Sequence, residues 1–289
     1  SYYFAPSGEA FDGITSQGFN AYEKSQFEVI FDMIASVAGL TFTEATTAAG
    51  TDFQLVASNN ADIDGYLGYF NPPGEVNEGV GVFNIDAWDR TSGGSTDAGG
   101  FDFITIVHEV LHGLGMAHPH DGGGTSDIFD GVSSPFGDYG DFDLNQGIFT
   151  TMSYNSGYST GTSGSTGDSG NNWGYEAGPM ALDMAVLQAL YGANTTTAAG
   201  NDTYVLPDTN LAGTYWTSIW DTGGIDVYLG RQRMLDTVFP ALLTAVLLVV
   251  FRARCRGVVQ IGLGALALVY LGADYLENAR VAGLLRTGP

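Results

Sequence analysis

The chain has 289 residues and a formal net charge of −23, but its charged residues are unevenly distributed. Residues 1–230 contain 29 acidic residues and only two basic ones, Lys24 and Arg90, whereas residues 231–289 contain seven arginines and three acidic residues. This composition argues against nucleic acid as a partner, because phosphate binding requires clustered Lys and Arg. The single cysteine, Cys255, leaves the first part without disulfides, and such an acidic part is consistent with a secreted protein stabilised by divalent cations.

The N-terminal part of the chain predicts one long helix followed by strands. The chain begins without an initiator Met or a signal sequence, as expected of a mature chain or a fragment, and residues 1–17 are loop-like. Apolar residues recur at helical spacing over residues 20–38, and Gly39 follows as a C-cap. Strands are predicted over residues 40–44, 52–57, 66–70 and 79–85.

A second helix is predicted to begin near Phe101 or Asp102, after a Gly/Ser/Thr-rich loop. Its polar side carries His108 and His112, which are four residues apart and therefore share one face, with Glu109 beside the first. One helix would thus serve packing on one side and chemistry on the other. The apolar side consists of Ile104, Val107, Leu111 and Leu114.

The spacing of these histidines is typical of a catalytic zinc site. His108 and His112 can direct two imidazoles at one ion, and Gly115 permits the turn that would bring in His118 as the third ligand. Three protein ligands and a water form the open tetrahedral arrangement of a catalytic zinc. Glu109 is then placed to take a proton from that water. The alternative is a core helix that carries histidines by chance, and the third histidine at this spacing argues against it.

An acidic, glycine-rich loop follows over residues 121–147. Oxygen-rich loops of this kind suit calcium, but the EF-hand pattern is absent and a solvated acidic loop is the alternative interpretation. Phe136, Tyr139 and Phe142 indicate that the loop is at least partly folded. Its acidic residues include Asp127, Asp130, Asp138, Asp141 and Asp143.

Three segments follow this loop. Residues 150–154 read Thr-Thr-Met-Ser-Tyr, and residues 155–172 form a surface loop rich in Gly, Ser, Thr and Asn. A last helix is predicted over residues 179–191, because it has proline at the favoured first position and glycine just after its end.

Together these motifs resemble those of the metzincin zinc metallopeptidases, through the zinc motif from His108 to His118. Pro119 and the Met-Ser-Tyr segment after it look like the serralysin branch of that family. Ala-Leu-Asp at residues 181–183 and Leu-Tyr-Gly-Ala-Asn at residues 190–194 resemble the last helix of the serralysin catalytic domain. The resemblance covers about residues 11–228.

The resemblance implies an α+β class, the metzincin zinc-protease fold. That fold has a twisted, mostly parallel sheet with an antiparallel edge strand, two long helices and a smaller C-terminal subdomain. Residues 1–194 would then be the catalytic domain, with an N-terminal subdomain to about residue 118 and a C-terminal subdomain over residues 119–194. Residues 195–230 look like a truncated start of the serralysin calcium domain, because no Gly-Gly-x-Gly-x-Asp repeats follow.

The resemblance also implies roles for individual residues. His108, His112 and His118 would be the zinc ligands and Glu109 the catalytic base. Met152 would form a hydrophobic floor beneath the histidines. Tyr154 would be an additional zinc ligand that swings away to stabilise the transition state, a role that suits a phenol donor.

Three further assignments are implied less directly. Asp202, Asp221 and Asp226 are candidate calcium ligands. His120 stands where a small residue is expected, and we leave it open as a partner of a ligand, a competing ligand or a surface residue. One segment is the candidate edge strand to which a substrate peptide would add, or it is an ordinary strand of the sheet. This segment consists of Tyr66, Leu67, Gly68, Tyr69 and Phe70.

The tail over residues 231–289 does not follow the family pattern. Residues 237–251 and 258–273 are apolar runs, and an arginine-rich connector lies between them. They predict a transmembrane helical hairpin through residues 237–273, although each run is shorter than the length that usually spans a bilayer. The alternatives are a pair of buried soluble helices, or a foreign segment joined by frameshift or fusion.

These observations predict a zinc-dependent endopeptidase, with calcium as a second expected metal. We expect it to act on protein and peptide substrates as a monomer, secreted or anchored by the tail. The alternative function is a non-catalytic zinc-bearing binding or adhesion module on a membrane stalk. The presence of Glu109 argues against this alternative, because a binding module has no need of a catalytic base.

Overall fold

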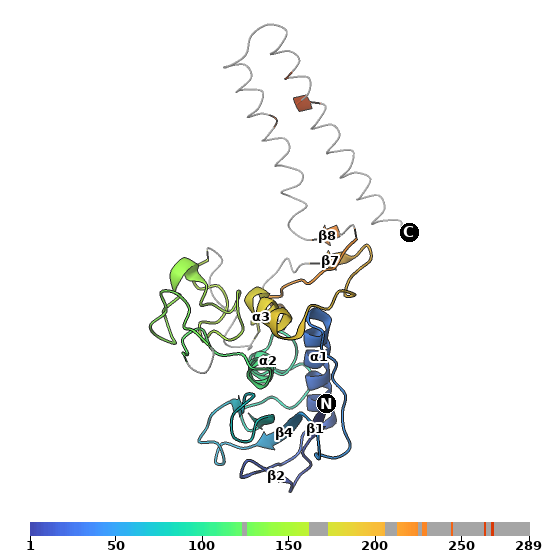
Figure 1. The fold of residues 1–289 in the computed structure, drawn as a ribbon, viewed down its shortest axis with the longest axis vertical. Coiled ribbons are helices and arrows are strands. Elements are labelled where there is room, and N and C mark those ends of the chain that lie inside the picture. The colour runs from blue at the N-terminus through green and yellow to red at the C-terminus, as the bar shows by residue number, and fades with distance from the viewer. Residues whose placement is uncertain are drawn as a thin grey trace. The chain divides into compact units, whose positions relative to one another are not determined.

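The computed structural model describes residues 1–122, 126–161, 173–205, 213–224 and 227–229, together with four single positions in the tail. The chain divides into two compact units. The first comprises Ser1–Gly200 and Thr209–Gly224, and the second comprises Asn201–Asp208 and Ile225–Pro289. The helices and the main sheet labelled in Figure 1 belong to the first unit.

The main sheet has four strands in the order β1-β4-β6-β5. The first three run parallel, and β5 pairs antiparallel with β6 at the edge of the sheet. This confirms the expected mostly parallel sheet with an antiparallel edge strand. The strands are β1 (Tyr2–Phe4), β4 (Phe53–Ser58), β6 (Val80–Asn84) and β5 (Gly68–Phe70).

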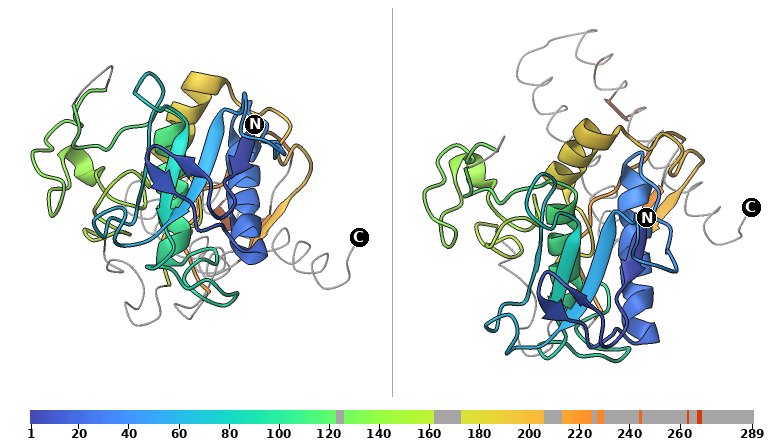
Figure 2. Two further views of the ribbon diagram at one scale, coloured as in Figure 1. Left: turned by 90° about the horizontal axis from the view of Figure 1, so that it is seen from below. Right: turned by 60° about the horizontal axis from the view of Figure 1, so that its bottom comes forward.

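Successive side chains along the strands point to opposite faces of this sheet. Leu55 and Phe83 lie in the main core with the helices, whereas Val56 and Val82 lie in a smaller cluster on the other face. A small hairpin packs against that second cluster (Figure 2). It consists of β2 (Ala10–Phe11) and β3 (Ile14–Thr15).

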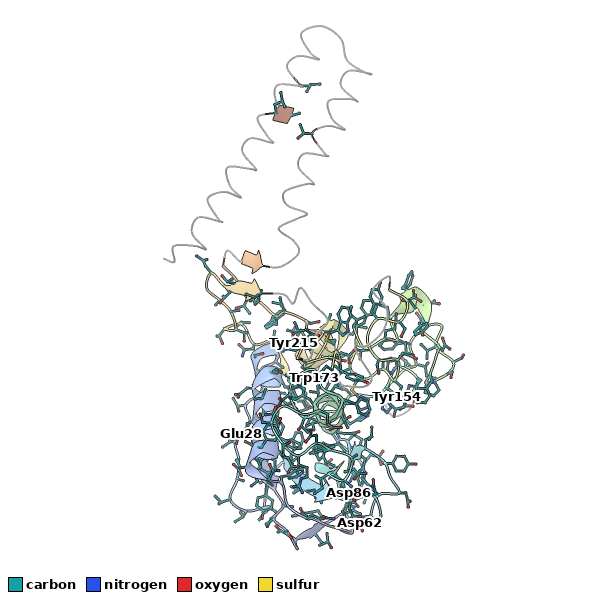
Figure 3. All side chains as sticks on the ribbon, turned by 180° about the vertical axis from the view of Figure 1, so that it is seen from behind. Glu28, Asp62, Asp86, Tyr154, Trp173 and Tyr215 are labelled. Atoms are coloured by element: carbon teal, nitrogen blue, oxygen red, sulfur yellow. The ribbon has the colours of Figure 1, made fainter. Side chains whose placement is uncertain are left out.

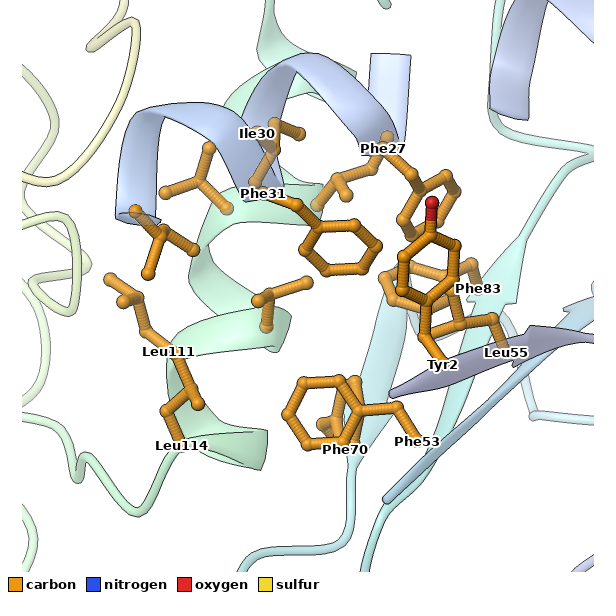
Figure 4. Packing of buried hydrophobic residues seen from close by; sticks show 14 of the residues in the cluster. Tyr2, Phe27, Ile30, Phe31, Phe53, Leu55, Phe70, Phe83, Leu111 and Leu114 are labelled. Carbon is orange, nitrogen blue, oxygen red and sulfur yellow. The ribbon is translucent and has the colours of Figure 1, made fainter. Parts of the chain in front are cut away.

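Two helices, α1 (Ala21–Val37) and α2 (Phe101–Gly113), cover the other face, and their apolar side chains pack together with those of the sheet in Figure 4. Asn20 caps α1 by accepting a hydrogen bond from the backbone N–H of Glu23. The buried Glu23 carboxylate also pairs with Arg90, at 2.6 Å between Oε1 and Nε. This ion pair ties the start of α1 to the loop before α2.

The second helix is more enclosed than expected. Its expected apolar face is buried, but Thr105, Glu109 and Val110 are buried as well. Gly113, at its last turn, lies so close to the Phe70 ring that a Cβ there would approach it to 2.6 Å. The helix that carries the histidines is therefore fixed between the sheet and the C-terminal half of the unit.

Three expectations about local structure are wrong. Residues 40–44 form only an isolated bridge, between Glu44 and Tyr2, and β1 was not expected in residues 1–17. The last helix, α3 (Ala181–Tyr191), begins after Pro179, because the N–H of Met180 donates to Asp183 and caps the helix there. A short 3-10 helix, η1 (Asp141–Asp143), lies in the acidic loop.

The second unit contains a parallel pair formed by β7 (Thr203–Val205) and β8 (Val227–Leu229). The predicted hairpin over residues 231–289 lies outside the described residues, except for four helical positions. Across the described part of the chain, no helix combines the length and the apolar character needed to cross a membrane. The four positions are Thr244, Leu263, Ala267 and Leu268.

Candidate metal centre and cleft

Three histidine side chains converge at the C-terminal end of α2. His108 and His112 lie one turn apart on the helix, and the chain then reverses at Gly115, which has a φ of +92°. The reversal brings the Nε2 atom of His118 to 3.0 Å from the Nε2 atoms of both helical histidines. The structure thus gathers the three predicted zinc ligands in one group that could hold a metal ion.

The other ring nitrogens determine which tautomer each imidazole adopts. Nδ1 of His108 lies 2.8 Å from the carbonyl oxygen of Thr151, and Nδ1 of His112 lies 2.8 Å from that of Met116. A carbonyl only accepts hydrogen bonds, so both Nδ1 atoms carry the proton and both Nε2 atoms present lone pairs. Nδ1 of His118 similarly contacts the Asp121 carboxylate.

Lone pairs that face one another repel unless a cation lies between them, so the short Nε2 separations fit a metal ion. Burial lowers the pKa of His108 to about 3 and that of His112 to about 4, which keeps both rings neutral. Three imidazoles, each with an acceptor at Nδ1, are a donor set suited to zinc.

Glu109 lies next to this group with only 8% of its surface exposed. Burial raises the pKa of its carboxyl to about 8. Gly68 of β5 packs directly on it, since a Cβ at that position would lie 3.2 Å from Cγ of Glu109 and 2.9 Å from the carbonyl oxygen of Val82. Only glycine at this position lets the edge strand lie against the glutamate without displacing it.

Asp183 holds the segment of Thr150 and Thr151, which contacts His108. Its buried carboxylate accepts hydrogen bonds from Oγ1 of Thr150 at 2.6 Å and from the backbone N–H of Thr151 at 2.8 Å. The carbonyl of Thr151 in turn accepts the Nδ1 proton of His108. Met152 follows and is fully buried. Sequence reasoning missed Asp183, because a single acid near a helix start carries no sign of its partners.

Tyr154 and His120 line the open side of the metal group. The Tyr154 ring lies 4.6 Å from His118 and 4.8 Å from His120, measured between centroids, and 40% of this tyrosine is exposed (Figure 3). His120 stacks on His118 at 4.8 Å and its side chain is only 13% exposed, so its interpretation as a surface residue is wrong. His118, His120 and Asp121 form a second group of potential metal ligands.

A cavity of about 360 Å³ opens beside His108 and Glu109. One wall is the face of α2 that precedes His108, and the opposite wall is the segment that leads to Tyr154. The end of β5 and the residues before it form a third side. The lining also includes Glu176, which no sequence motif singled out.

The candidate calcium ligands are only partly described. Asp202 belongs to the second unit, Asp221 belongs to the first, and Asp226 lies outside the described residues. Oδ1 of Asp221 accepts a hydrogen bond from the backbone of Gly223 at 2.9 Å. In the described part of the loop over residues 121–147, the five aspartates noted above do not form a group of three potential ligands.

Comparisons with known proteins agree with this arrangement. The chain is 31% identical over 225 residues to metallopeptidase AprA of Pseudomonas marginalis, 29% over 232 residues to a serralysin of Proteus mirabilis, and 32% over 227 residues to serralysin C of Dickeya chrysanthemi. These alignments cover 72 to 73% of this chain but 44% of each relative, so the chain spans less than half of their length. No protein-family model matches the chain.

The sheet with its antiparallel edge strand and the three converging histidines fit the expected class, a metzincin type of metallopeptidase segment. The similarity is to serralysins in particular, so the chain contains a serralysin-like segment that covers nearly three quarters of it.

Proposed function

We propose that the protein is a zinc-dependent endopeptidase that hydrolyses peptide bonds in protein substrates. The convergence of the Nε2 atoms of His108, His112 and His118 next to the buried carboxyl of Glu109 carries this proposal. The three imidazoles would hold the zinc ion. When bound, zinc would act as a Lewis acid that acidifies a water molecule and polarises the scissile carbonyl.

Glu109 acts as the proton carrier. Burial stabilises the protonated form of its carboxyl, whereas a divalent cation nearby would stabilise the carboxylate. The carboxylate is the form that can accept a proton. Glu109 takes the proton of the attacking water and delivers it to the amine that leaves. Gly68 allows β5 to close over one side of this carboxylate, which keeps it in place and restricts bulk water.

Met152 and Tyr154 complete the site. Met152 is buried and directly follows Thr151, whose carbonyl orients His108. It therefore suits the role of the apolar floor beneath the imidazoles. Tyr154 stands at the rim, where its phenol can serve as an additional zinc ligand and then as a donor to the developing oxyanion.

The substrate backbone adds to the edge of the sheet along residues 66–70. Within the described sheet, β5 pairs with β6 on one side only, so its other edge can pair with an extended peptide. The same edge borders the cavity next to Glu109, and this position would place the peptide across the metal group.

The wider assignments rest on the resemblance to serralysins. They are a catalytic domain over residues 1–194, a calcium-domain start over residues 195–230 with Asp202, Asp221 and Asp226 as ligands, a secreted location and a monomeric state.

Replacement of Glu109 by Gln tests the function. We expect the Glu109→Gln variant to keep one zinc per chain and to lose casein cleavage by a factor on the order of 10² to 10⁴, since proton transfer contributes about this much. Zinc content and casein cleavage with and without a chelator are measured for both proteins. Glu28→Gln, on the exposed side of α1 (Figure 3), is the control with the same change in charge.

Two results would contradict the proposal. Undiminished cleavage by the zinc-loaded Glu109→Gln variant would exclude the role of this carboxyl. A zinc-loaded unmodified protein without any cleavage would favour the non-catalytic binding module.

A further inference from the structure

Glu176 is a second buried carboxyl in the cavity beside the metal group. Its residue surface is only 3% exposed, and it lines the cavity together with His108 and Glu109. Its Oε1 atom accepts a hydrogen bond from the backbone N–H of Gly157 at 3.0 Å. Gly147 packs directly against it, since a Cβ there would approach Oε1 to 1.9 Å. The surrounding backbone therefore holds this carboxyl at the cavity wall.

The acidic part of the chain, residues 1–230, offers this carboxyl no cation. It contains two basic side chains, and both lie elsewhere: Arg90 pairs with Glu23 at 2.6 Å and Lys24 lies 4.0 Å from Glu44. Among the described residues, no ion pair involves Glu176. Burial raises its pKa to about 7, so a carboxylate at this wall forms at a cost that a bound cation would offset.

The rest of the cavity suits a long basic side chain. Phe101 and Ile104 of α2 provide apolar walls along which a hydrocarbon stem can pack. Thr105, Ser153 and Tyr154 add hydroxyl groups that can accept hydrogen bonds from an ammonium or a guanidinium group. A volume of about 360 Å³ accommodates a side chain of this size.

We propose that Glu176 makes this cavity a specificity pocket for a basic side chain, arginine or lysine, of the peptide substrate. The inference rests on the proposed function, because it places a residue next to the scissile bond in this pocket. The stem packs on α2 while the charged head reaches the Glu176 carboxylate. The excess of acidic residues within residues 1–230 also attracts basic peptides over a longer range.

The test compares arginine with citrulline, which has nearly the same shape but no charge. Two series of peptides carry arginine, citrulline or leucine on one side or the other of the scissile bond. For the zinc-loaded protein we expect kcat/KM to be at least about tenfold higher for arginine than for citrulline at one of these positions. A ratio near one at both positions overturns the inference without the need for any variant.

A variant then assigns the preference to Glu176. In Glu176→Gln we expect the ratio to fall to about one, while kcat/KM for the leucine peptide changes less than about threefold. The control Glu28→Gln removes the same charge from the surface and should keep the ratio. A ratio that survives in Glu176→Gln would assign the preference to another group and overturn the inference.

A binding measurement separates this inference from the proposed function. Glu109→Gln leaves Glu176 as the only acidic side chain that lines the described cavity. We expect Kd of the arginine peptide to be about tenfold lower than that of the citrulline peptide in this background, and equal to it in the double variant that also carries Glu176→Gln. If the unmodified protein cleaves no peptide but this difference in Kd is found, only the proposed function is refuted. If the two Kd values are equal in Glu109→Gln, the inference of a specificity pocket is refuted.

The pH dependence of the ratio in unmodified protein is a second measurement if Glu176→Gln does not fold. Asp183 and Tyr175 lie near this carboxyl, while His108, Glu109 and Tyr154 line the same cavity. Proton uptake by Glu109 would also weaken the attraction for arginine, so the same pH series is measured by peptide binding in Glu109→Gln, where Glu176 is the only acidic side chain that lines the described cavity. The arginine-to-citrulline ratio should decrease as pH falls from about 8 to about 6, since Glu176 loses its charge there. A ratio that stays constant with pH would overturn the inference.

Discussion

Burial shifts the pKa values of the acidic and the basic side chains of the cleft in opposite directions. The pKa values of His108 and His112 fall, whereas those of Glu109 and Glu176 rise, and desolvation is the first cause in all four. Desolvation disfavours the charged form whatever its sign, so burial favours the neutral form of these four side chains despite the acidic composition of the chain. One bound cation would therefore change the protonation of several groups at once.

The raised pKa of Glu176 predicts a pH-dependent cost to stability. The carboxyl titrates near its ordinary value of 4.5 in the unfolded chain and near 7 in the folded chain. The cost is therefore absent below about pH 4.5, grows as pH rises and is complete above about pH 7. Glu176→Gln should gain up to about 3 kcal/mol of unfolding free energy relative to the unmodified protein over this range.

Urea unfolding at about pH 5 and about pH 8 measures this difference. Glu28→Gln, which removes an exposed carboxyl from α1, is the control in the same comparison. A Glu176→Gln effect of equal size at both pH values would contradict the prediction.

At the scale of elements, α3 supports the metal group without contributing a ligand to it. Asp183 at the start of α3 binds Thr150 and Thr151, and the Thr151 carbonyl orients His108 on α2. Asp183→Asn should therefore weaken zinc binding by about 10- to 100-fold, as expected when a hydrogen-bonding partner behind a ligand is lost.

Competition with a chelator measures the zinc affinity of the folded variant, and thermal unfolding of the metal-free protein measures its general stability. Glu23→Gln is the matched control, because it disturbs a buried carboxyl at the start of α1, away from the histidines. The control should lower the metal-free Tm while zinc affinity stays unchanged. Equal zinc affinity in Asp183→Asn and the unmodified protein would refute the positioning role.

The sequence predicted the elements whose signals are local. His108, His112 and His118 lie within one helix and one turn, so their spacing alone places them together. The apolar periodicity correctly predicted the first two helices for the same reason. Glu176 was missed, because its proposed role depends on lining one cavity together with α2, which is far away in the chain. The strand β1 was missed because its three residues are too few for a pattern to emerge.

At the scale of the whole molecule, charge is the main feature. Residues 1–230 contain 29 acidic residues and two basic ones, so this part of the chain repels itself when folded. Added salt screens such repulsion, so Tm should rise when NaCl increases from about 10 to about 200 mM at neutral pH. Thermal unfolding with the zinc content held constant measures this, and an unchanged or lower Tm would contradict it.

The ion pair between Glu23 and Arg90 has a consequence for self-digestion. A peptidase that selects basic side chains meets only two of them within residues 1–230 of its own chain. Lys24 lies within α1, where the backbone is hydrogen-bonded and cannot extend along a sheet edge, and the Arg90 guanidinium is held by Glu23. The part of the chain that carries the cleft would therefore resist cleavage by the proposed activity, whereas the other seven arginines of the chain all follow residue 230.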